Sequence, residues 1–78
     1  MGNDDKDRVY EGTVIWFSRL NYGFISWEKD GFVQNDIFAH WSDIVSEGYK
    51  SLKKDQKVQF KLGINVRGQP KAIEITAV

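Results

Sequence analysis

Apolar and polar residues alternate along most of this chain in short runs separated by turn-forming residues. Within 57–64, for example, Val58, Phe60 and Leu62 alternate with Lys57, Gln59 and Lys61. Alternation with a period of two, bounded by Gly, Asn, Asp or Pro, is typical of β-strands. The pattern predicts strands at Tyr10–Phe17, Tyr22–Trp27, Ile37–Trp41, Lys57–Ile64 and Ala72–Val78.

The stretch Ser42–Gln56 has no strand pattern and is too long for a hairpin turn. Its first residues, 42–45, are predicted to form a single helical or 3₁₀ turn, and Gly48 limits the length of such a turn. We therefore predict a long connection between the third and fourth strands. An all-β, five-stranded antiparallel barrel suits this order, because closure removes exposed strand edges.

Strand alternation also predicts which side chains lie outside the barrel. In the second run Ile25 shares a face with Gly23, opposite Tyr22 and Phe24. In the third run Ile37 and Ala39 lie opposite Phe38 and His40. Since the aliphatic residues suit the interior, the other faces of both strands are predicted to be external. The predicted outer cluster consists of Tyr22, Phe24, Phe38 and His40.

Several aromatic rings on a solvated face are unfavourable unless something covers them. Planar bases cover rings well, at roughly 1–3 kcal/mol per stacked base. The alternative is that these rings are core residues. Against it, other apolar residues already suffice for one interior: Val14, Ile25, Ile37, Ala39, Val58, Phe60, Leu62, Ile73 and Ile75.

The bulk composition narrows the classes of function. The chain has 78 residues, no cysteine, one histidine and zero formal net charge. It is therefore expected to be one small domain (9–78) with a disordered polar tail (1–8), without disulfides or a metal site. Neutrality argues against a strongly electrostatic nucleic-acid binder but not against one that stacks bases. No run of residues is long and apolar enough for a transmembrane helix, so an intracellular protein is expected.

Five stretches of 10–78 together resemble the cold-shock domain family. They are Glu11-Gly12-Thr13-Val14 with Trp16-Phe17, Asn21-Tyr22-Gly23-Phe24-Ile25, Asp36-Ile37-Phe38-Ala39-His40-Trp41, Glu47-Gly48-Tyr49-Lys50-Ser51-Leu52, and Arg67-Gly68 with Pro70. Each stretch is a weak signal, but all of them in the family's order form a strong one.

The resemblance implies an OB-fold barrel that binds single-stranded RNA or DNA, prefers pyrimidines and acts like an RNA chaperone. It further implies a monomer in the cytoplasm, or in the nucleus of a eukaryote. The stacking positions that the resemblance implies are Trp16, Tyr22, Phe24, Phe38, His40, Trp41 and Tyr49, with Phe17 as a flanking position. Arg19 and Lys50 are the phosphate-contact candidates. For Lys53, Lys54 and Lys57, a phosphate contact and an ordinary solvated position remain equal alternatives.

The chain departs from the family pattern at several positions. The segment between Phe17 and Tyr22 is one residue shorter than usual, and Ile15 stands where the family usually has a Lys. The connection 27–35 is longer and carries Trp27 and Phe32, which we interpret as a local loop cluster. The alternative is an enlarged binding surface or a contact with a partner protein.

These departures keep a second function open, an OB-fold protein-interaction module with weak or lost nucleic-acid binding. An enzyme is not expected, because no nucleophile–base pair or metal cluster can be recognised in the sequence, and no cofactor is predicted.

Overall fold

The computed structural model describes residues 8–46 and 51–78. The predicted tail 1–8 therefore lies outside the described residues except for Arg8, and so do Tyr49 and Lys50. The elements of the described part are β1 (Tyr10–Phe17), β2 (Tyr22–Lys29), β3 (Phe32–Val33), β4 (Ile37–His40), the 3₁₀ turn η2 (Trp41–Asp43), β5 (Lys57–Ile64) and β6 (Pro70–Ala77).

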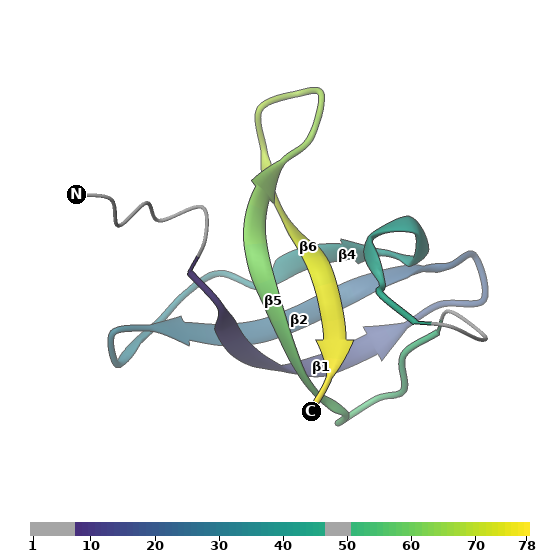
Figure 1. The fold of residues 1–78 in the computed structure, drawn as a ribbon, viewed down its shortest axis with the longest axis horizontal. Coiled ribbons are helices and arrows are strands. Elements are labelled where there is room, and N and C mark those ends of the chain that lie inside the picture. The colour runs from purple at the N-terminus through teal and green to yellow at the C-terminus, as the bar shows by residue number, and fades with distance from the viewer. Residues whose placement is uncertain (1–7, 47–50) are drawn as a thin grey trace.

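Five of these strands close into a barrel. β1 pairs with β2, β2 with β4, β5 with β6 and β1 with β5, all antiparallel. The ring is completed where Phe38 of β4 pairs in parallel with Lys71 of β6. In Figure 1 the β5–β6 hairpin crosses the other strands and projects beyond them. The all-β OB-type barrel predicted from the sequence is confirmed, with one parallel contact among its antiparallel pairs.

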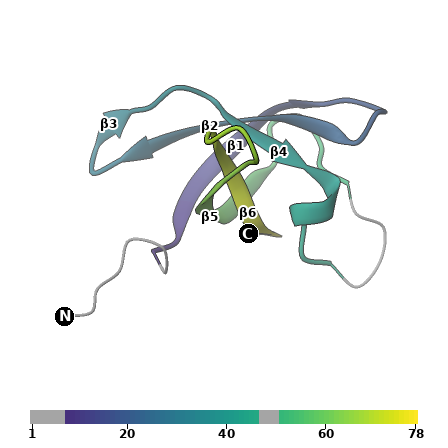
Figure 2. The same cartoon turned by 90° about the horizontal axis from the view of Figure 1, so that it is seen from above.

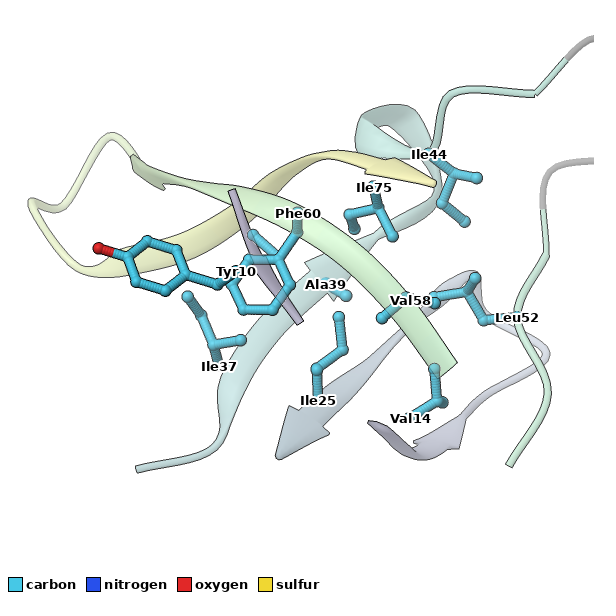
Figure 3. Packing of buried hydrophobic residues seen from close by; sticks show 11 residues of the cluster. Tyr10, Val14, Ile25, Ile37, Ala39, Ile44, Leu52, Val58, Phe60 and Ile75 are labelled. Atoms are coloured by element: carbon cyan, nitrogen blue, oxygen red, sulfur yellow. The ribbon is translucent and has the colours of Figure 1, made fainter. Parts of the chain in front are cut away.

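The core fills the interior of the barrel (Figure 3). Its buried residues are Tyr10, Val14, Ile25, Ile37, Ala39, Ile44, Leu52, Val58, Phe60, Ala72 and Ile75. Leu62 is only partly buried but packs against this cluster. Most of the predicted interior is therefore confirmed, and Tyr10, Ile44, Leu52 and Ala72 are added to it.

The prediction that Ile73 lies inside the barrel is wrong. Strand β6 contains a bulge, since Ile73 pairs with Lys61 while Thr76 pairs with Gln59. Glu74, in this bulge, has a φ of 49°. A bulge adds one residue to a strand and reverses its alternation. Ala72 and Ile75 consequently both point inward, and Ile73 lies on the outside.

The predicted loop 27–35 is a hairpin that extends the sheet beyond the barrel. β2 continues to Lys29, and β3 pairs with β2 alone. Asp30 and Gly31 turn the chain with φ values of 54° and 86°, as a two-residue hairpin turn requires. Figure 2 shows this hairpin at one end of the molecule and η2 at the other.

The interpretation of Trp27 and Phe32 as one loop cluster is wrong. Trp27 packs edge-on against Tyr10 and Phe60, with ring centroids 5.0 and 5.6 Å away, and so belongs to the end of the core. The Phe32 side chain is 73% exposed.

The connection after β4 contains the expected 3₁₀ turn, which is η2. Just after this turn in the sequence, Val45 donates its backbone N–H to Ile75 O at 2.8 Å, and this hydrogen bond joins the connection to β6. Among the described residues, no helix is long and apolar enough to cross a membrane.

Candidate nucleic-acid interface

Six aromatic side chains form one continuous cluster on the outer face of β1, β2 and β4. We call this cluster, Trp16, Tyr22, Phe24, Phe38, His40 and Trp41, the ring platform. Neighbouring ring centroids lie 5.6 to 6.4 Å apart. Trp16 contacts Tyr22 and Phe24, both of these rings contact Phe38, and the cluster continues through His40 to Trp41. The two ends, Trp16 and Trp41, are 40% and 41% exposed. A chain of partly exposed rings offers successive stacking positions to planar ligands.

The register of β2 against β4 explains the centre of the platform. Tyr22 pairs with His40 and Phe24 with Phe38, so four rings meet on one side of two adjacent strands. The residues between them point into the barrel, where Ile25 and Ala39 are completely buried. The outward placement of these rings predicted from strand alternation is therefore confirmed.

Trp16 reaches the platform only because β1 contains a bulge. Val14 pairs with Ile25 while Trp16 pairs with Phe24, which leaves Ile15 as an extra residue. Simple alternation would point Trp16 to the same side as Val14, which is completely buried. The bulge turns the Trp16 ring outward, 5.8 Å from Phe24.

The short turn between β1 and β2 positions the far end of the platform. Asn21 has a φ of 72°, a left-handed conformation that Asn tolerates better than most residues. In this geometry Asn21 O accepts a hydrogen bond of 2.9 Å from the backbone N–H of Trp41. The shortened turn thus holds the start of η2 beside Tyr22, a role that the sequence did not reveal.

The orientation of the His40 ring is determined by Ser42. The backbone N–H of Ser42 donates to His40 Nδ1 at 3.2 Å, and Ser42 Oγ lies 2.8 Å from the same nitrogen. Because a backbone N–H can only donate, Nδ1 acts as an acceptor and the ring proton is assigned to Nε2. The ring stacks on Phe38, with centroids 6.4 Å apart, and carries a donor at Nε2.

Two of the other predicted site residues, Phe17 and Arg19, lie within the described part of the chain. Phe17 is half-buried and packs against the core, on the side of β1 opposite Trp16. Arg19 is exposed in the turn after β1. Tyr49 and Lys50 lie outside the described residues, so their placement stays a prediction.

Two lysines lie beside the platform. Lys71 pairs with Phe38 in the barrel closure and contacts Asp43 Oδ2 at 3.2 Å. Lys57 donates to Thr13 Oγ1 at 3.0 Å, one pair along the outer face from Trp16 and Phe24. In the described ranges, no group of three or more His, Cys, Asp or Glu side chains could hold a metal ion.

Comparison with known proteins agrees with this geometry. The family model described as "'Cold-shock' DNA-binding domain" matches residues 10–78. A cold shock-like protein of Thermotoga maritima is 41% identical over 68 residues, which cover 86% of this chain and 96% of that protein. Cold shock domain-containing protein 4 of Arabidopsis thaliana is 40% identical over 67 residues, 85% of this chain but 32% of that protein. The chain belongs to the cold-shock domain family, whose members bind single-stranded nucleic acids.

Proposed function

We propose that this chain binds single-stranded RNA or DNA by stacking bases on the ring platform and that it prefers pyrimidine-rich strands. The supporting observation is the ring platform itself, in which six aromatic side chains adjoin one another on one outer face. The stacking free energy should be about 1–3 kcal/mol per base. All six rings come from a single copy of the chain, so the proposed function requires only a monomer.

The proposed mechanism is an RNA-chaperone activity without a catalytic step. Bases that stack on protein rings are unavailable for pairing, and bases in a duplex cannot reach the rings. Binding therefore shifts weakly paired structures toward unpaired strands by mass action. Such an activity fits a cytoplasmic protein and requires no cofactor.

Tryptophan fluorescence tests the proposal, because Trp16 and Trp41 stand at the two ends of the platform. Adding a pyrimidine oligonucleotide of six or seven nucleotides at low salt should quench the emission, whereas a duplex long enough to stay paired under the same conditions should not. The salt dependence should be shallow, about 0.7 logarithmic units per neutralised phosphate, because few cations adjoin the rings. Absence of quenching at micromolar oligonucleotide would contradict the proposal.

A protein-interaction module is the second candidate, and the β2–β3 hairpin favours it. Phe32 and Val33 are 73% and 79% exposed there, outside the barrel. A protein partner on this hairpin should be lost after Phe32→Ser in a pull-down, while oligonucleotide binding remains. If oligonucleotides fail to bind but such a partner does, this second function replaces the first.

A further inference from the structure

An open groove continues the outer face beyond Phe24. It has a volume of about 600 Å³ and is lined by Glu11, Gly12, Thr13, Ser26, Trp27, Glu28, Gly31, Val33 and Lys57. The pair Thr13 and Ser26 follows the outward pair Trp16 and Phe24 along β1 and β2. The groove therefore begins directly where the ring platform ends.

The groove exists because β1 and β2 separate at this point. Their last pair is Gly12 with Trp27. Beyond it Glu11 keeps only its β5 partner, Gln59, and Glu28 pairs with Val33 of β3. The longer β2–β3 hairpin thus supplies one wall, and the start of β1 supplies the other.

Two contacts hold the hairpin wall in place. Trp27 Nε1 donates to Asn35 O at 2.9 Å, and Arg8 forms an ion pair with Asp30 in the turn. The wall is therefore joined to both the core and the start of β1, so the groove is formed before any ligand binds.

The polar groups of the groove suit the edge of a nucleobase. Thr13 Oγ1 accepts from Lys57 and keeps its own proton to donate, while Ser26 Oγ donates to Thr13 O at 3.4 Å and keeps its lone pairs. Glu11 Oε2 accepts from Gln59 at 3.4 Å. Within the described part of the chain, the exposed Glu28 carboxylate has no hydrogen-bond or ion-pair partner.

We propose that this groove binds one further nucleotide of the strand that stacks on the platform, and that it selects a base with an exocyclic amino group. Glu28 accepts the amino hydrogens, and Lys57 contacts the adjoining phosphate. The proposal rests on the proposed function of the platform and adds base selectivity to it, because stacking alone is tolerant of sequence.

Cytosine and uracil differ in the way this selection requires. Cytosine presents its N4 amino group, which carboxylates accept in protein–nucleic-acid contacts. Uracil presents a carbonyl oxygen at the same position, and this oxygen is repelled by the Glu28 carboxylate. A single Lys57 beside two glutamates favours one nucleotide rather than a longer stretch of phosphates, since further phosphates would meet Glu11 and Glu28.

Calorimetric titration of uridine oligonucleotides that carry one cytidine at the 5′ end, at the 3′ end or in the centre tests the proposal. A cytidine at one of the two ends should tighten binding about fivefold relative to the all-uridine strand. Glu28→Ala should abolish this gain, and all-uridine binding should tighten slightly because the repulsion of the uracil carbonyl is lost. Lys57→Ala should weaken binding of every strand and reduce the salt slope by about 0.7.

Glu74→Ala is the matched control, because Glu74 is an exposed carboxylate on β6 that pairs with Lys61 at 3.3 Å and does not line the groove. It should keep the cytidine gain. The groove proposal is overturned if wild type and Glu28→Ala show the same cytidine gain, or if wild type shows no gain at either end. In both cases, normal binding of the all-uridine strand leaves the platform proposal standing. Failure of every strand to bind would overturn both, and the groove would then suit a protein partner.

Discussion

The same sheet carries two aromatic clusters on its two sides, and their positions give them different roles. The inner cluster, Tyr10, Trp27 and Phe60, has ring centroids 5.0 to 6.1 Å apart, much like the ring platform outside. Phe60 is only 1% exposed, however, whereas Trp16 and Trp41 are 40% and 41% exposed. Ring chemistry and spacing therefore do not distinguish a structural cluster from a binding one. The two clusters differ in the face of the strand from which their rings project.

Backbone irregularities decide which side a ring takes. Trp16 and Trp27 lie on paired strands, yet the bulge at Ile15 sends Trp16 outward while Trp27 follows regular alternation inward. The comparison therefore predicts that inner rings affect folding and outer rings affect binding.

Removing an inner ring should have the largest effect. Phe60→Ala takes away the largest fully buried side chain and leaves a cavity in the core, which should lower the free energy of unfolding by about 3–5 kcal/mol. Urea denaturation followed by far-ultraviolet circular dichroism measures this loss. The fraction that stays folded should bind oligonucleotide as wild type does, and a stable variant with lost binding would refute the division.

The second-largest effect is expected from a substitution at Gly23, which lies against the backbone of β1 at Trp16 and Phe17. Gly23 is buried where β2 pairs with the end of β1, and a Cβ there would lie 2.1 Å from Trp16 O and 2.8 Å from Phe17 Cα. Because both neighbours are backbone atoms, Gly23→Ala should force the strands apart and cost roughly 1–3 kcal/mol or more of stability.

The same change should also displace Trp16 and weaken oligonucleotide binding. Thermal unfolding and calorimetric titration of one preparation would measure both effects. A matched substitution, Gly68→Ala, adds a Cβ that meets no atom within 4 Å, although the positive φ of 81° strains it locally. It should lower stability without altering binding. Wild-type binding by Gly23→Ala would show that the platform does not depend on this close approach.

Removing an outer ring should affect affinity rather than stability. Phe38 lies at the centre of the platform, in contact with Tyr22, Phe24 and His40. Phe38→Ala should weaken oligonucleotide binding by about 1–3 kcal/mol. Its loss of unfolding free energy should be smaller than that of Ile25→Ala, which removes a completely buried side chain. If Phe38→Ala unfolds the domain instead, this ring belongs to the core.

Acid should produce the smallest effect, through the ion pair at the turn of the β2–β3 hairpin. A hydrogen bond from Arg8, together with its positive charge, lowers the pKa of Asp30 below its ordinary value of 3.8. A lowered carboxyl pKa contributes stability above the unfolded-state value and loses it as the pH falls through the folded value. The Arg8–Asp30 pair should therefore hold at neutral pH and be lost only below roughly pH 4.

Nuclear magnetic resonance can follow this loss through the amide signal of Gly31 during an acid titration. The signal should move below roughly pH 4 in wild type. The midpoint should rise toward the ordinary aspartate value in Arg8→Ala. A midpoint that is the same in both proteins would show that Arg8 does not stabilise the ionised carboxylate.

Much of the barrel and the centre of the platform could be predicted from the chain, because both follow from regular alternation. Ile25 and Phe24, or Ala39 and Phe38, occupy opposite faces wherever strands are regular. The wrong assignment of Ile73 arose at a bulge, for which the sequence offered no signal. Trp16 was assigned through the family resemblance alone, since alternation would have buried it.

Long-range contacts account for the other differences. Trp27 looked like a loop residue because its partners, Tyr10 and Phe60, are distant in sequence. The groove beyond Phe24 likewise depends on where β1 and β2 stop pairing with each other, which the pattern of a single strand does not contain. Ser42 and Asn21 act through backbone atoms, and their types gave no indication of contacts to His40 and Trp41.

The three tryptophans allow the most direct test of the division between the two clusters. Trp27→Phe leaves only the platform tryptophans, and the double variant Trp16→Phe, Trp41→Phe leaves only the inner one. An all-uridine oligonucleotide should quench the emission of Trp27→Phe and leave that of the double variant unchanged, even where calorimetry shows the double variant still binding. Unchanged emission from Trp16 and Trp41 during binding would contradict base stacking on the ring platform, whereas quenching of Trp27 in the double variant would place a base in the groove that Trp27 lines.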